Sequence, residues 1–174
     1  MRTLLLGLAA LLAGCSSAPD HGPRVVTPAS ADQKKQLWEP LAKLAGEWTT
    51  VGEDGKTVTA LVVKVSSGGS IIHEEMMPGS PYEMTNVYHL DGPSVVMTHY
   101  CAAGNQPRMR ATEAKDGKFA FRADSVTNLR SADETYMGSM TLTITDADHI
   151  QQEWISYTGE KEDPCETFKY ARKK

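Results

Sequence analysis

The chain has 174 residues, with 22 acidic and 18 basic side chains and a formal net charge of -4. This length suits a single domain. The acidic balance, with no basic stripe, argues against a nucleic-acid partner, which would require clustered Lys and Arg.

The first residues have the form of a secretory signal. Arg2 precedes an apolar run over 4–12, and Leu12-Ala13-Gly14 forms a small-residue cleavage site directly before Cys15. The run is too short to span a bilayer as a helix. We therefore expect residues 1–14 to be a removable signal peptide.

Leu12 to Cys15 resembles the lipobox of bacterial lipoproteins. The resemblance implies that the Cys15 thiol is acylated, that Cys15 becomes the first residue, and that the protein is anchored in the cell envelope. Ser16, where inner-membrane lipoproteins carry Asp, resembles outer-membrane lipoproteins that face the periplasm of a Gram-negative host. The alternative is an ordinary signal peptide with an incidental Cys15.

Residues 15–29 are rich in Ser, Ala, Pro and Gly without apolar periodicity, which is typical of a flexible tether. Ser30 and Gln33 then have the spacing of a capping box. Leu37, Leu41 and Leu44 share one face at helical spacing. We expect a short helix here, kinked by Pro40 and ended by Gly46.

The rest of the chain alternates apolar and polar residues between turn signals such as Asp-Gly and Pro-Gly. The pattern predicts about ten strands, at 47–52, 56–66, 70–77, 82–90, 94–102, 107–115, 118–124, 136–145, 149–158 and 165–171. Sequential antiparallel strands with short connections favour an all-β, up-and-down barrel, because closure removes exposed strand edges. Residues 30–174 would form this domain.

Gly46-Glu47-Trp48, after a short helix, resembles the Gly-x-Trp motif on the first strand of lipocalins and other calycins. The resemblance implies that Trp48 packs across the closed end of a barrel. The segment 98–109 is similar to uncharacterised bacterial lipocalin-like proteins, a likeness that implies no function.

Strand register predicts which side chains enter the barrel, because successive side chains alternate between faces. A tight turn at Asp116-Gly117 would place Phe119 and Phe121 inside. Propagating the same register through the loops at 103–106, 91–92 and 78–81 predicts a polar inner wall made of His73, Glu75, Asn86, His99, Arg108 and Arg110. The opposite wall would be apolar, with Met140, Leu142, Ile150, Trp154, Phe168 and Tyr170.

Buried polar side chains require a partner, and three interpretations follow. A small amphipathic anion could bind, since Arg108 and Arg110 match carboxylate or phosphate. Alternatively, the six polar residues could satisfy one another in a structural barrel that binds nothing. Haem or metal binding is a third interpretation, although nearby arginines repel a cation. No catalytic arrangement and no cofactor motif is recognisable, so an enzyme is not expected.

Two cysteines remain after Cys15. In an oxidising compartment Cys101 and Cys165 could form a disulfide. Their strands would lie on opposite sides of the barrel, so only the loop 159–164 could bring the two sulfurs together.

Overall fold

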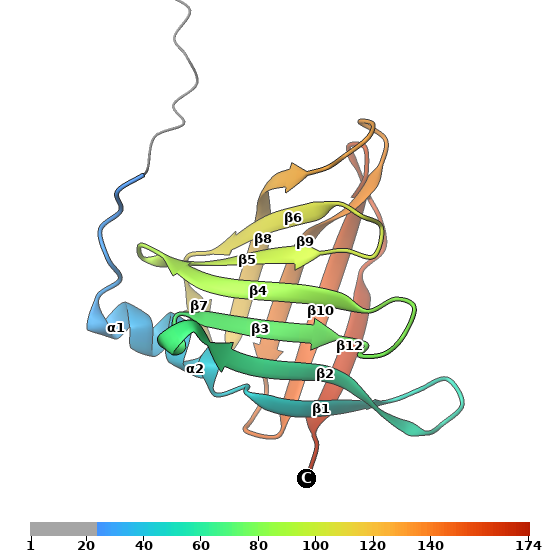
Figure 1. The fold of residues 1–174 in the computed structure, drawn as a ribbon, viewed down its shortest axis with the longest axis horizontal. Coiled ribbons are helices and arrows are strands. Elements are labelled where there is room, and N and C mark those ends of the chain that lie inside the picture. Colours follow the sequence, from blue (N-terminus) through green and yellow to red (C-terminus); the bar gives the residue numbers. More distant parts are fainter. Residues whose placement is uncertain (1–23) are drawn as a thin grey trace, which may run out of the picture.

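A computed structural model describes residues 24–174, and Cys15 and the signal peptide lie outside this range. The fold is a closed, ten-stranded antiparallel β-barrel preceded by one short helix (Figure 1). Neighbouring long strands pair in chain order, and β1 closes the barrel against β12. The predicted up-and-down topology is confirmed, because each strand lies beside the one that follows it along the chain.

The long strands are β1 (Gly46–Val51), β2 (Thr57–Ser66), β3 (Ile71–Met76), β4 (Met84–Asp91), β5 (Ser94–Tyr100), β6 (Gln106–Ala111), β8 (Lys118–Thr127), β9 (Thr135–Ile144), β10 (His149–Thr158) and β12 (Glu166–Arg172). Two short strands, β7 (Ala114–Lys115) and β11 (Lys161–Glu162), extend hairpins at the barrel rim. Asp116 and Gly117 both have positive φ, as the predicted tight turn between β7 and β8 requires.

The helix begins at the predicted capping box, in which Ser30 Oγ accepts from the Gln33 N–H and Gln33 Oε1 accepts from the Ser30 N–H. It comprises α1 (Ala31–Gln33), a π-helical turn over Lys34–Trp38 and α2 (Glu39–Ala42). Pro40 has no N–H to donate to the preceding turn of the helix. The π-helical turn over Lys34–Trp38 lies just before Pro40. The predicted disturbance at Pro40 thus takes the form of a π-helical turn.

The helix covers one end of the barrel. Leu37, Leu41 and Leu44 are buried, and the completely buried Trp48 donates from Nε1 to the Leu44 carbonyl over 2.8 Å. Trp48 therefore lies at the closed end, as predicted. Among residues 24–174, no helix is long and apolar enough to cross a membrane.

The barrel interior contains one large apolar cluster. Apolar side chains from every long strand meet there, including Leu61, Ile72, Met97, Met109, Phe119, Phe121, Met140, Leu142 and Trp154. The loops between β1 and β2, β3 and β4, β5 and β6, β8 and β9, and β10 and β12 all lie at the end opposite the helix (Figure 1). We call this end the mouth.

Candidate functional site at the barrel mouth

Arg108 and Arg110 do not point into the barrel, which corrects the sequence prediction. On β6 the buried side chains are Pro107, Met109 and Ala111, and the two arginines alternate with them on the outer face. The predicted orientation of β6 was therefore reversed.

Three differences from the predicted register explain the reversal. Lys115 pairs with Lys118 as predicted, but β6 and β7 are separated by Thr112 and Glu113, and a bulge separates Arg108 from Met109 opposite β8. The register of β5 against β6 also differs from the prediction, since Thr98 lies opposite Arg108, whereas a loop at 103–106 would place it opposite Ala111. Each shift of one residue moves a whole strand to the other face.

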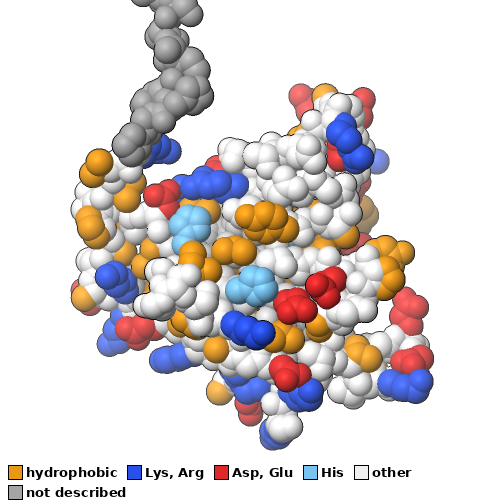
Figure 2. Space-filling view, in the orientation of Figure 1, with side chains coloured by type: hydrophobic (Ala, Val, Ile, Leu, Met, Phe, Trp, Pro, Cys, Tyr) orange, Lys and Arg blue, Asp and Glu red, His pale blue; other side chains and the backbone are white. Residues whose placement is uncertain are grey.

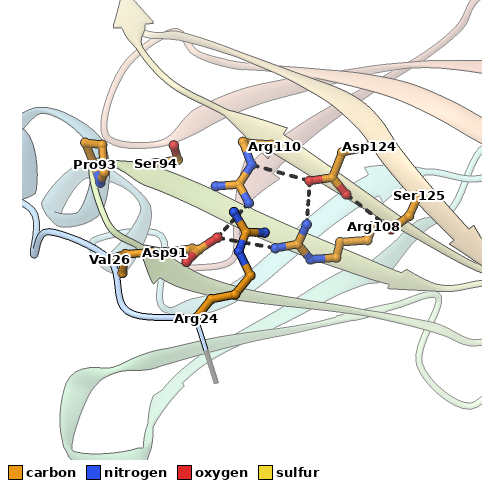
Figure 3. A pocket seen from close by; sticks show the side chains of 9 residues that line it. All are labelled: Arg24, Val26, Asp91, Pro93, Ser94, Arg108, Arg110, Asp124 and Ser125. Atoms are coloured by element: carbon orange, nitrogen blue, oxygen red, sulfur yellow. Dashed lines mark hydrogen bonds and ion pairs between the residues drawn. The ribbon is translucent and has the colours of Figure 1, made fainter. Parts of the chain in front are cut away.

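On the outer face the arginines form an ion-pair cluster with Asp91 and Asp124 (Figure 3). Arg110 Nη2 lies 2.6 Å from Asp91 Oδ2, and Arg108 pairs with Asp124. The hydrogen bond from Arg110 lowers the pKa of Asp91. Figure 2 shows charged and histidine side chains interspersed with apolar ones on one outer face of the barrel. Both guanidinium groups are already paired with carboxylates on the outer face. Arg108 and Arg110 are therefore not available as the ligands for an anion inside the barrel that the sequence had suggested.

A second correction concerns β3. Ile72, Glu74 and Met76 are buried, whereas His73 and Glu75 are only half-buried on the outer face. Met76 pairs with Met84 across the β3–β4 loop, which sets a register one residue away from the predicted one. The carboxylate inside the barrel is therefore that of Glu74.

Glu74 is the centre of a buried hydrogen-bond network. Its carboxylate accepts from Asn86 Nδ2 over 2.7 Å, from Gln152 Nε2 over 3.1 Å and from the Tyr88 hydroxyl over 3.3 Å. Burial raises the pKa of Glu74, and these hydrogen bonds oppose the rise. The network satisfies the carboxylate without a cation or a ligand.

Asn86 and His99 do face inward, as predicted. Asn86 Oδ1 lies 2.7 Å from His99 Nδ1, and the His99 ring packs on Trp154 with centroids 4.9 Å apart. Since Asn86 Nδ2 donates to Glu74, its oxygen must accept the proton of Nδ1. Burial lowers the pKa of His99 to about 4, so the imidazole is neutral. Its Nε2 is buried and has no hydrogen-bond partner among the described residues.

Cys101 and Cys165 are both free thiols in this structure, so the disulfide considered from the sequence is not formed. Cys101 follows β5 and Cys165 precedes β12, which are not neighbours in the sheet. Within residues 24–174, no three His, Cys, Asp or Glu side chains are grouped as a metal site would require.

The feature best suited to a ligand is a cavity of about 1010 Å³ at the mouth, which we call the mouth cavity. It lies between the β1–β2 hairpin, the β3–β4 loop and β12. Phe168 and Tyr170 form an aromatic wall with nearly parallel rings, 6.5 Å between centroids. The other apolar side chains that line it are Val51, Val58, Ala60, Met77, Pro78 and Tyr82.

Three of these side chains are unusually exposed for apolar residues. Val51 is 68%, Val58 46% and Tyr82 69% exposed, and all three border the mouth cavity. Contiguous exposed apolar surface in a concave site is typical of ligand binding.

Tyr170 supplies a polar group to this apolar wall. Burial and the nearby Glu74 carboxylate raise the pKa of Tyr170, so its hydroxyl remains protonated. Among the described residues, no side chain hydrogen bonds to that hydroxyl.

Sequence reasoning placed Phe168 and Tyr170 inside but assigned them only to an apolar wall. The apolar residues at the tips, Val51, Val58 and Tyr82, lie beside turn signals in the sequence and were not assigned to a site. Their apolar character next to Gly and Pro was the available signal.

The chain matches no model of a known protein family, and no curated protein matches it either. The closed ten-stranded barrel with a preceding helix is compatible with a lipocalin-like fold.

Proposed function

We propose that this protein is a lipid-anchored, lipocalin-like binding protein of the cell envelope that holds a small apolar or amphipathic molecule in the mouth cavity. The observation that carries the proposal is the mouth cavity itself, with the aromatic wall of Phe168 and Tyr170. Its volume lies at the upper end of the roughly 300–1,000 Å³ range of small-molecule sites.

The binding test is a fluorescence titration with N-phenyl-1-naphthylamine, a neutral apolar probe. The full chain would carry Cys15→Ser in every sample, so that no acyl group on the protein competes for the cavity. We expect saturable binding, and roughly tenfold weaker binding in Phe168→Ala, because an aromatic contact surface is lost.

Tyr100→Ala is the matched control. Tyr100 is 49% exposed at the end of β5 and does not border the mouth cavity. Its removal should leave probe affinity unchanged. No saturable binding, or equal binding by both variants, would refute the binding proposal.

The competing function is a structural envelope protein, and one observation favours it. The polar core around Glu74 is already satisfied by Asn86, Tyr88 and Gln152. The same titration separates the two proposals, because a structural barrel would not bind the probe saturably.

The anchor is proposed from Leu12-Ala13-Gly14-Cys15, with the outer membrane as its site in a Gram-negative host. Acylation would place the protein in the detergent phase of a Triton X-114 partition. Cys15→Ser should move it to the aqueous phase. If Cys15→Ser left the partition unchanged, the anchor proposal would be wrong.

A further inference from the structure

The barrel is joined only briefly along β1 and β12. Trp48 pairs with Arg172 and Thr49 with Ala171, and on the mouth side the pairing of these two strands ends there. Beyond it, the Thr50 hydroxyl reaches across to the Lys169 carbonyl over 3.0 Å. β1 runs on to Val51 in a hairpin that extends away from the barrel (Figure 1). The barrel wall therefore has a gap between the outer halves of β1 and β12.

A groove on the outer surface meets the mouth cavity at this gap. The groove has a volume of about 620 Å³ and reaches the inward-facing residues Ile150 and Tyr170. It shares Thr50, Val51, Lys169 and Tyr170 with the mouth cavity. The two spaces are thus adjacent on either side of the β1–β12 gap. We call the outer space the seam groove.

The seam groove differs in chemistry from the mouth cavity. Its outward-facing side chains are mainly hydroxyl, amide and basic groups, namely Thr49, Thr57, Thr145, His149, Gln151 and Lys169. Lys169 alternates with Phe168 and Tyr170 on β12, so its ammonium group lies outside the barrel. Among the ion pairs of residues 24–174, none includes Lys169.

The charges on the two sides of the gap favour one orientation of a ligand. Glu53 borders the mouth cavity and would repel an anionic group there. Lys169 borders both spaces, but no Asp or Glu among residues 24–174 lines the seam groove, so an anionic group is attracted there without that repulsion. His149 also borders the groove, but its Nδ1 already lies 3.0 Å from the Asp146 carboxylate. Lys169 is therefore the basic side chain of the groove that has no ion-pair partner among residues 24–174.

We propose that the seam groove is a head-group subsite and that the ligand is a single-chain amphiphile with a carboxylate or phosphate head. This inference rests on the proposed function. The alkyl chain lies against Phe168 and Tyr170 in the mouth cavity, passes through the gap on the mouth side of the Thr50–Lys169 hydrogen bond, and places its anionic head beside Lys169. The hydroxyl groups of the groove supply further donors.

The test is displacement of N-phenyl-1-naphthylamine by decanoate, decyl phosphate and 1-decanol, in the full chain with Cys15→Ser. Both anions should displace the probe at roughly three- to fivefold lower concentration than the alcohol, as for a solvent-exposed ion pair. That preference should shrink in about 0.5 M NaCl because salt screens exposed charges.

Gln151 lies directly opposite Lys169 across β10 and β12, which allows a test in both directions. Gln151→Lys should strengthen binding of the two anions, and Gln151→Glu should weaken it by engaging Lys169. Lys169→Gln should abolish the preference for the anions over 1-decanol. Lys118→Gln, an exposed lysine on β8, is the matched control.

The outcomes separate the two proposals. If the probe does not bind, the proposed function fails. If the probe binds but all three competitors are equivalent and Lys169 and Gln151 variants change nothing, the head-group subsite is refuted and the mouth site stands. A preference for only one of the two anions supports the subsite and identifies its head group.

Discussion

The side chains of Asn86 and His99 are joined inside the barrel, with 2.7 Å between Asn86 Oδ1 and His99 Nδ1. The contact couples the imidazole to the Glu74 carboxylate through a single amide, because Asn86 Nδ2 donates to Glu74. Burial lowers the pKa of His99 to about 4, so this imidazole is neutral near pH 7. Two predictions concern this pair.

The first prediction is acid sensitivity. Burial lowers the pKa of His99 to about 4, whereas an unfolded histidine titrates near 6.5. Between these values the unfolded state binds more protons, so stability falls as pH falls, by on the order of 3 kcal/mol in total. The raised pKa of Glu74 acts in the opposite sense, because the folded state takes up its proton first.

His99→Gln isolates the histidine contribution, since it retains an amide donor for Asn86 but cannot titrate. Urea unfolding at about pH 7 and about pH 5 should show a smaller loss for His99→Gln than for the unsubstituted chain. His73→Gln, on the outer face of β3, should retain the original loss. Equal losses in all three proteins would contradict the assignment.

The second prediction concerns the amide of Asn86. Asn86→Leu preserves the shape but removes the donor to Glu74 and the acceptor for His99, leaving both without that partner. We expect the free energy of unfolding to fall by roughly 2–4 kcal/mol. Thr85→Val, the outward-facing neighbour, should change it by less than about 0.5 kcal/mol. Chemical denaturation of both variants measures the difference.

At the closed end, Arg172 connects the last strand to the helix. Its guanidinium carbon lies 4.2 Å from the Trp48 ring centroid, and the group donates to the carbonyls of Lys43, Ala45 and Ala147. Arg172→Met should reduce stability by about 2–3 kcal/mol, because three carbonyls lose a donor. Arg172→Lys should recover only part of this, since an ammonium lacks the planar fork.

The neighbouring Lys173 provides the comparison for Arg172. It forms an exposed ion pair with Glu47, and Lys173→Met should cost less than about 1 kcal/mol. Melting temperatures of the three variants test the ranking. A loss from Lys173→Met as large as that from Arg172→Met would show that net charge, rather than the contacts of Arg172, stabilises this end.

The outer ion-pair cluster should be separable from ligand binding. Arg110→Met leaves Asp91 with Arg108 at 3.4 Å, and the cluster is partly solvated, so the expected loss is about 1 kcal/mol. N-phenyl-1-naphthylamine affinity should not change. Arg122→Met, opposite Arg110 on β8, is the control. Weaker probe binding in Arg110→Met alone would return Arg110 to the ligand site.

The sequence by itself determines three features, because alternation, turn residues and caps are local signals. These features are the strands, the capping box at Ser30 and Gln33, and Trp48 at the closed end. It does not determine the faces of β3 and β6. A bulge beside Arg108 and the registers across the loops after β3 and β5 differ from those that the turns predict, and they bring Met76 and Met109 into the core. The tertiary structure decided that Glu74 is buried instead of Glu75, that Arg108 and Arg110 lie outside, and that a gap separates the outer halves of β1 and β12. The reason is that the face of each strand depends on its pairing register with both neighbours, and these registers must be mutually consistent around the closed barrel.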